Sequence, residues 1–304
     1  MDKTKVTLAN RGPVLTETKF KNYDLCINPY VGCEFGCKYC YVRFFVKDKE
    51  KPWGDFVRLR AHLVDKLPKE LPKAAGKRIV IGTMTDPYQP LEREHRLTRK
   101  VLELIDKAEV KPSKIGVFTR SPIVVEDIDL LKKMPRIRVH LTITPYEREV
   151  LSKLEPIAIS PQRRWDTVKA LKDAGIRVHI NVSPVLPIWS EPFTQDFADK
   201  MAATGVDEFY VDPMQAYGEA MTATEAAVGH LKEWETIKGI LLDKTKYKEW
   251  KETYRKAWFA AWEKHKDCKT LAIWQDHMNH VWTNMSTNTP MDPKLYGDDL
   301  DAAH

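Results

Sequence analysis

The sequence predicts an α/β fold, a partial (βα)6 TIM-type barrel followed by a helical, tryptophan-rich C-terminal extension. Between residues 78 and 213, short β-branched runs alternate with amphipathic or charged segments, which is typical of βα units on a parallel sheet. The chain has 304 residues, a length that α/β barrels often reach as one unit. Five of the nine tryptophans lie in the last 60 residues, so this end differs from the repeating part.

Six strands are expected, at residues 24–28, 78–84, 114–120, 138–144, 177–185 and 208–212. The intervening helices are expected at residues 96–108, 124–133, 163–174, 194–203 and 225–242. Ser160 and Pro161 give one helix a cap residue and a first-turn proline, and Gly175 follows its end. Six units joined by right-handed crossovers curl into most of a barrel and leave one side open.

We divide the chain into an N-terminal arm at residues 1–23, the barrel at 24–242 and the extension at 243–304, which we expect to cover the open side. Aromatic side chains recur every four residues in the extension, at Trp250, Tyr254, Trp258 and Trp262. On a helix they form one stripe, which we expect to pack against the barrel. An exposed platform that stacks on bases is the alternative. The acidic residues after 290 are expected to be loosely held.

The composition indicates a globular protein, because 43% of the residues are hydrophobic and 30% are charged. It excludes a disordered chain, a collagen-like repeat and a disulfide scaffold. No stretch approaches the roughly 20 apolar residues of a membrane span, and the N-terminal residues lack the apolar run of a signal peptide. We therefore expect a cytoplasmic protein. The 49 basic residues exceed the 43 acidic ones by 6, which favours an anionic partner without identifying it.

Three of the five cysteines, Cys33, Cys37 and Cys40, fall within eight residues of a loop after the first predicted strand. In a chain without an export signal this clustering favours metal binding over disulfides. Thiolates in a CxxxCxxC spacing can each reach a different iron of a cubane cluster, helped by the backbone freedom of Gly32 and Gly36. The fourth iron then keeps an open position for a substrate or cosubstrate.

Two other kinds of metal protein remain open. A zinc-dependent nucleic-acid binding module would combine Cys37 and Cys40 with His277 and His280, or with Cys268, but this leaves Cys33 without a role. An iron–sulfur electron carrier would normally close its cluster with a fourth cysteine.

The cysteine loop and its surroundings resemble the radical S-adenosylmethionine (SAM) superfamily, and more narrowly the branch that contains spore photoproduct lyase and DNA repair photolyase-like proteins. The stretches that carry the resemblance are residues 28–41, 82–92, 97–99, 119–121, 154–156 and 184–187. They cover the region from residue 24 to 212, and they imply a partial barrel of the radical SAM type. The C-terminal extension carries no such resemblance.

The resemblance implies that Cys33, Cys37 and Cys40 bind a [4Fe–4S] cluster whose open iron binds SAM. An electron from the reduced cluster then cleaves SAM to a 5′-deoxyadenosyl radical, which abstracts a hydrogen atom from the substrate. It further implies a lyase-like enzyme acting on nucleic acid or a nucleotide, in DNA lesion repair or base modification. An electron donor such as flavodoxin or ferredoxin would be a partner.

The same resemblance implies a set of SAM contacts. Tyr39 and Ser183 would lie near the adenine, and Arg120 near the carboxylate. The amino group would meet the end of the second strand, and the ribose hydroxyls would meet the end of the fourth. These two strand ends contribute Thr83, Thr85 and Asp86, and Thr142 and Thr144. For each hydroxyl, a buried group satisfied by neighbouring backbone is the alternative.

One departure from the resemblance concerns the hydrogen donor. In spore photoproduct lyase the segment that matches residues 82–86 carries a cysteine, which returns a hydrogen atom to the product radical. Here the segment reads Gly-Thr-Met-Thr-Asp. Splitting of a spore-type thymine dimer would therefore need another donor, such as Tyr88, Cys26 or Cys268.

Overall fold

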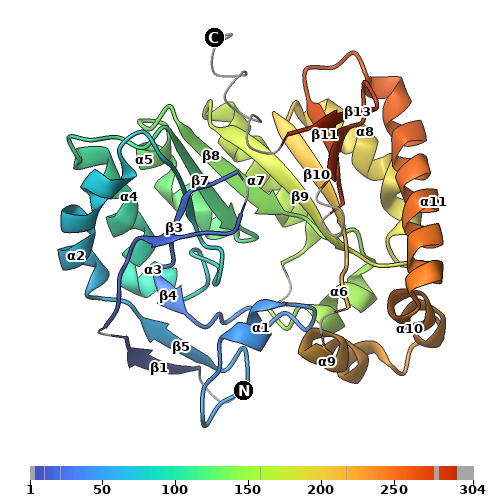
Figure 1. The fold of residues 1–304 in the computed structure, drawn as a ribbon, viewed down its shortest axis with the longest axis horizontal. Coiled ribbons are helices and arrows are strands. Elements are labelled where there is room, and N and C mark those ends of the chain that lie inside the picture. The colour runs from blue at the N-terminus through green and yellow to red at the C-terminus, as the bar shows by residue number, and fades with distance from the viewer. Residues whose placement is uncertain are drawn as a thin grey trace. The chain divides into compact units, whose positions relative to one another are not determined.

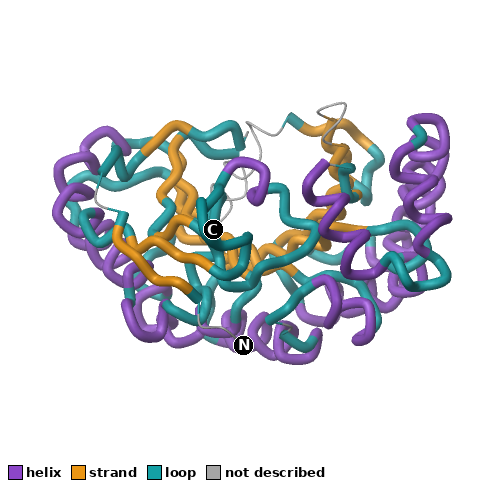
Figure 2. The backbone as a smooth tube through the Cα atoms, turned by 90° about the horizontal axis from the view of Figure 1, so that it is seen from below, coloured by secondary structure: helices purple, strands orange, loops and turns teal. Residues whose placement is uncertain are grey.

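The computed structural model describes residues 4–292 except 10, 21, 158, 217 and 277–280. The chain forms two compact units. The first unit comprises Met1–Leu141 and Glu155–Val178, and the second comprises Thr142–Leu154 and His179–His304. Within each unit most helices, purple in Figure 2, lie on one side of the strands.

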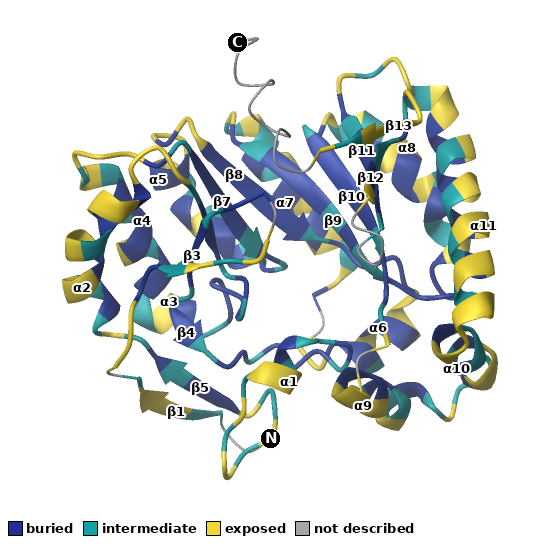
Figure 3. Ribbon diagram, in the orientation of Figure 1, coloured by how far each residue is buried: buried dark blue, intermediate teal, exposed yellow. Residues whose placement is uncertain are grey.

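The first unit contains a mainly parallel sheet in the order β2-β3-β6-β7-β8 (Figure 1). Its strands are β2 (Thr16–Glu17), β3 (Leu25–Ile27), β6 (Arg78–Ile81), β7 (Lys114–Thr119) and β8 (Ile137–Thr142). Only β2 runs antiparallel to its neighbour. Strands β6 to β8 are buried on both faces and appear dark blue in Figure 3, as parallel strands between layers require. Four of the predicted strands are thus confirmed, with ends that differ by at most three residues.

The remaining elements of the first unit surround this sheet. A small second sheet has the order β1-β5-β4, from β1 (Lys5–Leu8), β5 (Phe56–Leu59) and β4 (Tyr30–Val31). The α-helices are α1 (Val42–Phe45), α2 (Leu63–Glu70), α3 (Glu92–His95), α4 (Leu97–Lys107), α5 (Ile128–Leu131) and α7 (Pro161–Asp173). The 3-10 helices are η1 (Leu71–Ala74) and η2 (Pro122–Asp127). The hydroxyl of Ser160 caps α7, as the sequence predicts.

The second unit contains a sheet in the order β9-β10-β11-β12-β13. Its strands are β9 (Arg177–Val185), β10 (Glu208–Pro213), β11 (Leu271–Asp276), β12 (Val281–Asn284) and β13 (Thr289–Met291). The first three are parallel and the last two form an antiparallel edge. The helices are α6 (Arg148–Leu154), α8 (Thr194–Thr204), α9 (Gly218–Val228), α10 (Trp234–Leu242) and α11 (Lys244–Trp262), with short 3-10 turns η3 (Glu191–Phe193) and η4 (Glu263–His265).

Helix α11 packs its aromatic stripe inward, as predicted. Trp250, Tyr254, Trp258 and Trp262 are all buried. The ring of Phe209 on β10 contacts the rings of Trp258 and Trp262, with centroids 5.8 and 4.9 Å apart. Figure 1 shows α11 running beside α8, and Figure 3 shows its opposite side exposed. No helix among the described residues, α11 included, combines the length and the apolar character that crossing a membrane requires.

Three segments differ from the sequence prediction. Residues 124–133 form the 3-10 helix η2 and only then α5. The helix expected over 225–242 is interrupted, because α9 ends at Val228 and α10 begins only at Trp234. Beyond α11, the extension forms strands β11 to β13 instead of helix, and β11 continues the parallel sheet. The acidic residues from 293 onward lie outside the described residues.

A close contact at Gly116 in the first unit allows a test of the core packing. A Cβ built on Gly116 of β7 would lie 2.1 Å from the hydroxyl oxygen of Tyr23. This ring is buried and its hydroxyl is hydrogen bonded to His140 at 2.7 Å, so it has little room to move. Gly116→Ala is therefore expected to lower the free energy of unfolding by about 1–3 kcal/mol, measured by denaturant titration.

The matched control is Gly239→Ala in α10, where an added Cβ meets nothing within 4 Å. This change is expected to raise the free energy of unfolding by up to about 1 kcal/mol, because alanine favours helix over glycine. Equal effects of the two substitutions would show that Tyr23 is not held as the structure indicates.

Candidate functional site

The cysteine loop, residues 28–41, lies between β3 and α1 in the first unit. Two tight turns shape it, because the Gly36 amide donates to the Cys33 carbonyl and the Cys40 amide to the Cys37 carbonyl, both at 3.2 Å. Gly32 has a φ of 90°, and a Cβ there would lie 2.4 Å from the Phe56 carbonyl oxygen. Only glycine fits this position, so the loop is pressed against β5.

The three thiols of the loop are free and mostly shielded from water. Cys33 and Cys37 are buried and Cys40 is half-buried. Burial raises the pKa of all three thiols, that of Cys37 to about 12 although the Arg120 charge opposes the rise. Without a metal these groups therefore stay protonated at neutral pH, and a bound metal would have to displace their protons.

The donor set fits an iron–sulfur cluster, because thiolate sulfur is the ligand that such clusters take. Among the described residues, no three or more His, Cys, Asp or Glu side chains surround a point that a single metal ion could occupy. Thiolates that bind different irons of one cube need not meet at such a point. His277 and His280, required by the zinc hypothesis, lie outside the described residues.

Residues 82–92, after β6, hold the start of the cysteine loop. The Met84 amide donates to the side-chain oxygen of Asn28 at 2.9 Å, and the amide nitrogen of Asn28 donates to the Thr83 hydroxyl at 3.3 Å. The Tyr41 hydroxyl donates to the Thr83 carbonyl at 2.9 Å. Thr83 thus contacts both ends of the cysteine loop.

The same segment also binds the middle of the loop. The Thr85 hydroxyl donates to the Gly32 carbonyl at 2.6 Å. The Glu34 amide donates to the side-chain oxygen of Gln89 at 2.8 Å, and the Leu91 amide donates to the Glu34 carboxylate at 2.7 Å. The hydroxyls of Thr83 and Thr85 therefore have protein partners, and their contact with SAM stays a prediction.

Asp86 joins the ends of β6 and β7. The Thr119 hydroxyl donates to its carboxylate at 2.6 Å, and the backbone amides of Tyr88 and Arg120 each donate at 2.9 Å. Burial raises the pKa of Asp86, while the Thr119 hydroxyl and the Arg120 amide oppose the rise. The carboxylate fixes the backbone of Arg120 next to the cysteine loop.

Arg120 enters a buried cluster of charges centred on Glu155. Its guanidinium donates to the Tyr39 hydroxyl at 2.6 Å and to the Glu155 carboxylate at 2.7 Å, and it lies over the Phe35 and Tyr39 rings. Glu155 also accepts hydrogen bonds from Tyr39 and Arg164. The side chains of Glu155 and Arg164 are each 1% exposed. Two cations thus share one carboxylate beside Cys37.

The pKa of Glu155 reflects its two cationic neighbours, Arg164 and Arg120. Burial alone would raise it, but Arg164, Arg120 and the hydrogen bonds from Tyr39 and Arg164 outweigh burial and lower it to about 2. Glu155 was not predicted to be a site residue, although residues 154–156 are among the stretches that carry the resemblance. An acidic residue inside an otherwise apolar run was the available signal.

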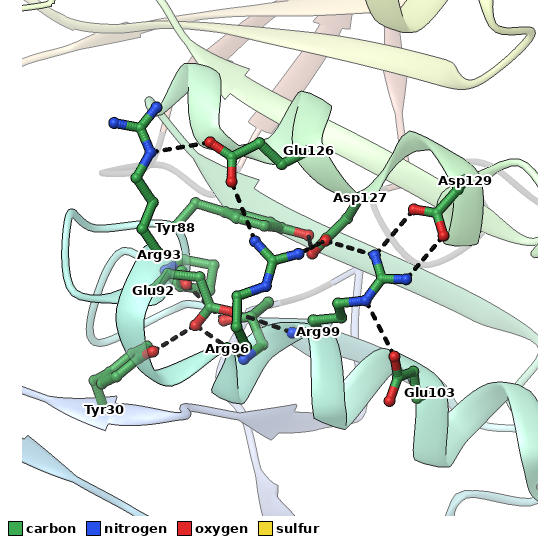
Figure 4. Close-up of polar contacts among 12 residues, drawn as sticks. Tyr30, Tyr88, Glu92, Arg93, Arg96, Arg99, Glu103, Glu126, Asp127 and Asp129 are labelled. Carbon is green, nitrogen blue, oxygen red and sulfur yellow. Dashed lines mark hydrogen bonds and ion pairs between the residues drawn. The ribbon is translucent and has the colours of Figure 1, made fainter.

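A second network of hydrogen bonds and ion pairs, shown in Figure 4, holds Tyr88 and Glu92 of the segment 82–92. Glu92 is buried and accepts hydrogen bonds from the Tyr30 hydroxyl and from the amides of Thr98 and Arg99. The buried Asp127 accepts from Tyr88, Arg96 and Arg99. Arg96 holds a left-handed backbone with a φ of 51°, which costs energy for a residue with a side chain. The network therefore fixes α3 and α4 to η2.

The other predicted SAM contacts belong to the second unit. Thr142 is the last residue of β8 and the first residue of the second unit, and Thr144 lies two residues later. Between them, the Ile143 amide donates to the Asn181 carbonyl of β9 at 3.0 Å. Ser183 lies on β9 and donates its hydroxyl to Asp212 at 3.2 Å. The structure thus brings Cys33, Cys37, Cys40, Tyr39, Thr83, Thr85, Asp86 and Arg120 together in the first unit, and Thr142, Thr144 and Ser183 in the second.

Comparison with known proteins adds a family match. Residues 27–199 match the model of the radical SAM superfamily, and this range includes every predicted site residue. An uncharacterized protein of Methanocaldococcus jannaschii is 35% identical over 57% of this chain and 64% of its own length, so the chain spans less than two thirds of that relative. A radical SAM Nalpha-GlyT isomerase of Pseudomonas phage M6 is 27% identical over 62% of this chain and 39% of its own length.

Solved structures share the fold. A spore photoproduct lyase mutant with a dinucleoside spore photoproduct has a TM-score of 0.69 and 15% identity, over 89% of this chain and 82% of its own. Another mutant of that enzyme, with bound AdoMet and the same dinucleoside, also has a TM-score of 0.69 and 15% identity, over 88% and 81% of the two chains.

The buried charge cluster leads to a stability prediction. Glu155→Gln removes the carboxylate charge that pairs with both Arg120 and Arg164, so we expect the free energy of unfolding at pH 7 to fall by about 3–5 kcal/mol. The loss of stability caused by Glu155→Gln should become smaller as the pH falls. Because the folded pKa of Glu155 is lowered to about 2, its stabilisation is complete above the unfolded value near 4.5 and is lost as the pH falls toward 2.

Glu126→Gln is the matched control. Glu126 pairs with Arg93 and Arg96, but its side chain is 37% exposed. Water and salt screen such a pair, so the loss should stay below about 1 kcal/mol. Denaturant titrations of both variants at several pH values provide the measurement, and a pH-independent effect of Glu155→Gln would contradict this account.

Proposed function

Because the chain belongs to the radical SAM superfamily, we propose that it cleaves SAM reductively and abstracts a hydrogen atom from a nucleic acid or nucleotide. Members of this superfamily use a [4Fe–4S] cluster and SAM. The proposal rests on the CxxxCxxC loop, in which two buried thiols and one half-buried thiol would bind three irons of a cube and leave the fourth iron without a protein ligand.

Cys33, Cys37 and Cys40 would hold three irons of the cluster, and SAM would bind the fourth. When reduced, the bound cluster supplies the electron that breaks the bond between sulfur and the 5′-carbon of SAM. The chain's own residues keep the thiols in place. Thr85 and Gln89 bind the loop backbone, and the buried surroundings keep water away from a reactive radical.

Arg120 is the residue we assign to the SAM carboxylate. Its guanidinium lies against Tyr39, which stands between two of the cysteines, and Glu155 holds it there. A cation fixed beforehand loses little entropy when it binds an anion. Tyr39 would offer its ring to the adenine, because its hydroxyl is already engaged by Glu155 and Arg120. The end of β6 and the hydroxyls of Thr142, Thr144 and Ser183 complete the proposed SAM contacts.

Three observations support the proposed reaction and its nucleic acid or nucleotide substrate. The chain has a net charge of +6. It shares its fold with spore photoproduct lyase, which has been solved with a dinucleoside lesion. The third observation concerns the chemistry, since the chain also matches a phage enzyme named as a radical SAM isomerase. The absence of cysteine from residues 82–86 argues against splitting a spore-type dimer by the lyase's own route.

Anaerobic reconstitution with iron and sulfide tests the chemistry. The proposal predicts a brown protein that, with dithionite, converts SAM into methionine and 5′-deoxyadenosine. Cys37→Ala should abolish this conversion, whereas Cys268→Ala, outside the cysteine loop, should preserve it. A brown protein that leaves SAM intact would favour an electron carrier, and a colourless protein that binds zinc would favour the zinc module.

A separate measurement tests the substrate class. We expect short DNA or RNA to bind the reconstituted protein, with an affinity that falls as the salt concentration rises, because Lys and Arg contacts with phosphates release counterions. Fluorescence anisotropy at graded salt gives the slope. No binding, or binding independent of salt, would contradict the assignment of a polyanionic substrate.

A further inference from the structure

Two adjacent aromatic side chains next to the cysteine loop face solvent. Phe44 is 57% and Phe45 63% exposed, and Phe20, the other exposed phenylalanine among the described residues, is only 39% exposed. Helix α1 anchors itself through Val42 alone, so neither ring contributes to a core. Adjacent apolar side chains left in water commonly mark an interaction site.

The surroundings of these rings are positively charged. Residues 38–51 contain five Lys or Arg and two acidic residues. Both acidic residues are already paired within the chain, Asp48 with Arg58 at 2.8 Å and Glu50 with Lys5. Lys47 and Lys49 are exposed, and the Lys47 ammonium lies 6.0 Å from the centroid of the Phe44 ring. We call Arg43, Phe44, Phe45, Lys47 and Lys49 the α1 surface.

The α1 surface lies close to a cluster ligand. The Phe44 amide donates to the Tyr41 carbonyl at 3.0 Å, and the rings of Tyr41 and Phe45 meet edge to face with centroids 6.4 Å apart. Tyr41 directly follows Cys40, the least buried of the three thiols. An approaching protein that covers the two phenylalanines therefore comes near Cys40 without having to enter the buried site.

We propose that the α1 surface docks a small acidic electron-transfer protein, with a low-potential flavin or iron–sulfur group, that reduces the cluster. This inference rests on the proposed function. One electron leaves the flavin hydroquinone anion of the donor, which becomes the neutral semiquinone, and the cluster is reduced by one electron. No bond forms or breaks. Electron transfer weakens steeply with distance, so a donor must dock close to the cluster.

The features of the α1 surface suit such a partner better than a nucleic acid strand. Complexes for electron transfer are small and transient, and opposite charges steer their encounter. A small apolar patch flanked by cations meets both requirements. A base-stacking platform needs open ring faces. Here the two phenylalanine rings pack edge to face with centroids 5.2 Å apart.

The test compares two reductants of the reconstituted full-length protein. Stopped-flow absorbance follows the bleaching of the cluster by reduced bacterial flavodoxin and, separately, by dithionite. The test variants are Phe44→Ser with Phe45→Ser, and Lys47→Glu with Lys49→Glu. Each pair is expected to slow bleaching by flavodoxin at least about tenfold at low salt and to leave bleaching by dithionite unchanged, because a small reductant needs no docking surface.

Matched controls lie elsewhere in the first unit. Phe20→Ser removes another exposed ring, and Lys132→Glu with Lys133→Glu reverses two exposed charges at the end of α5. Both should leave the flavodoxin rate unchanged. Equal slowing by controls and test variants, or unchanged flavodoxin rates in the test variants, would overturn the proposal.

A binding measurement separates this inference from the proposed function. Anisotropy of fluorescently labelled flavodoxin should show at least a tenfold weaker affinity for both test variants, even for protein that fails to cleave SAM. If the wild-type protein holds no cluster, the proposed function fails, and flavodoxin binding still decides the docking proposal. Loss of binding to short single-stranded DNA, with flavodoxin affinity retained, would assign the α1 surface to nucleic acid and refute the proposal.

Discussion

The site depends on hydrogen bonds between two loops. Apart from the short strand β4, residues 28–41 have no ladder of their own to fix the three thiols. Their positions come from the neighbouring segment 82–92, where Thr83, Thr85 and Gln89 bind backbone or side-chain groups along the loop. Because buried backbone groups need partners, the polar residues of one loop are constrained by the backbone of the other. Both loops must therefore fold together.

This constraint explains why polar side chains near the thiols already have hydrogen-bond partners within the protein. Asp86 and Glu155 are buried carboxylates, which are costly unless they are paired and hydrogen bonded. The Asp86 carboxylate accepts hydrogen bonds from Thr119 and Arg120 at the end of β7. The Glu155 carboxylate accepts hydrogen bonds from Tyr39 and from the guanidiniums of Arg120 and Arg164. The result is a fixed positive group, Arg120, beside Cys37. Preorganised charge of this kind favours an anion in the same place without further rearrangement.

Repeating patterns in the sequence predicted the parts of the fold that local chemistry determines. All six expected strands and the buried stripe of α11 follow from β-branched runs and from aromatic residues four positions apart. Strand β11 was missed because the apolar run around Ile273 and Trp274 is too short to distinguish a buried strand from a helix segment by periodicity. The role of Glu155 was missed because its partners, Tyr39 and Arg120, come from distant parts of the chain and only folding brings them together.

Trp258 and Phe45 differ in burial. The difference distinguishes a residue that stabilises the fold from a residue that can bind a partner. Both are large aromatic residues on helices, but only Trp258 belongs to a stripe that the sequence predicts to be buried. Trp258 is fully buried against Phe209, so the fold accounts for it. Phe45 is 63% exposed on a helix of four residues, and its ring contacts with Tyr41 and Phe44 do not bury it. A local choice that the fold does not explain points to a functional requirement, and the nearest candidate is the cysteine loop one turn away.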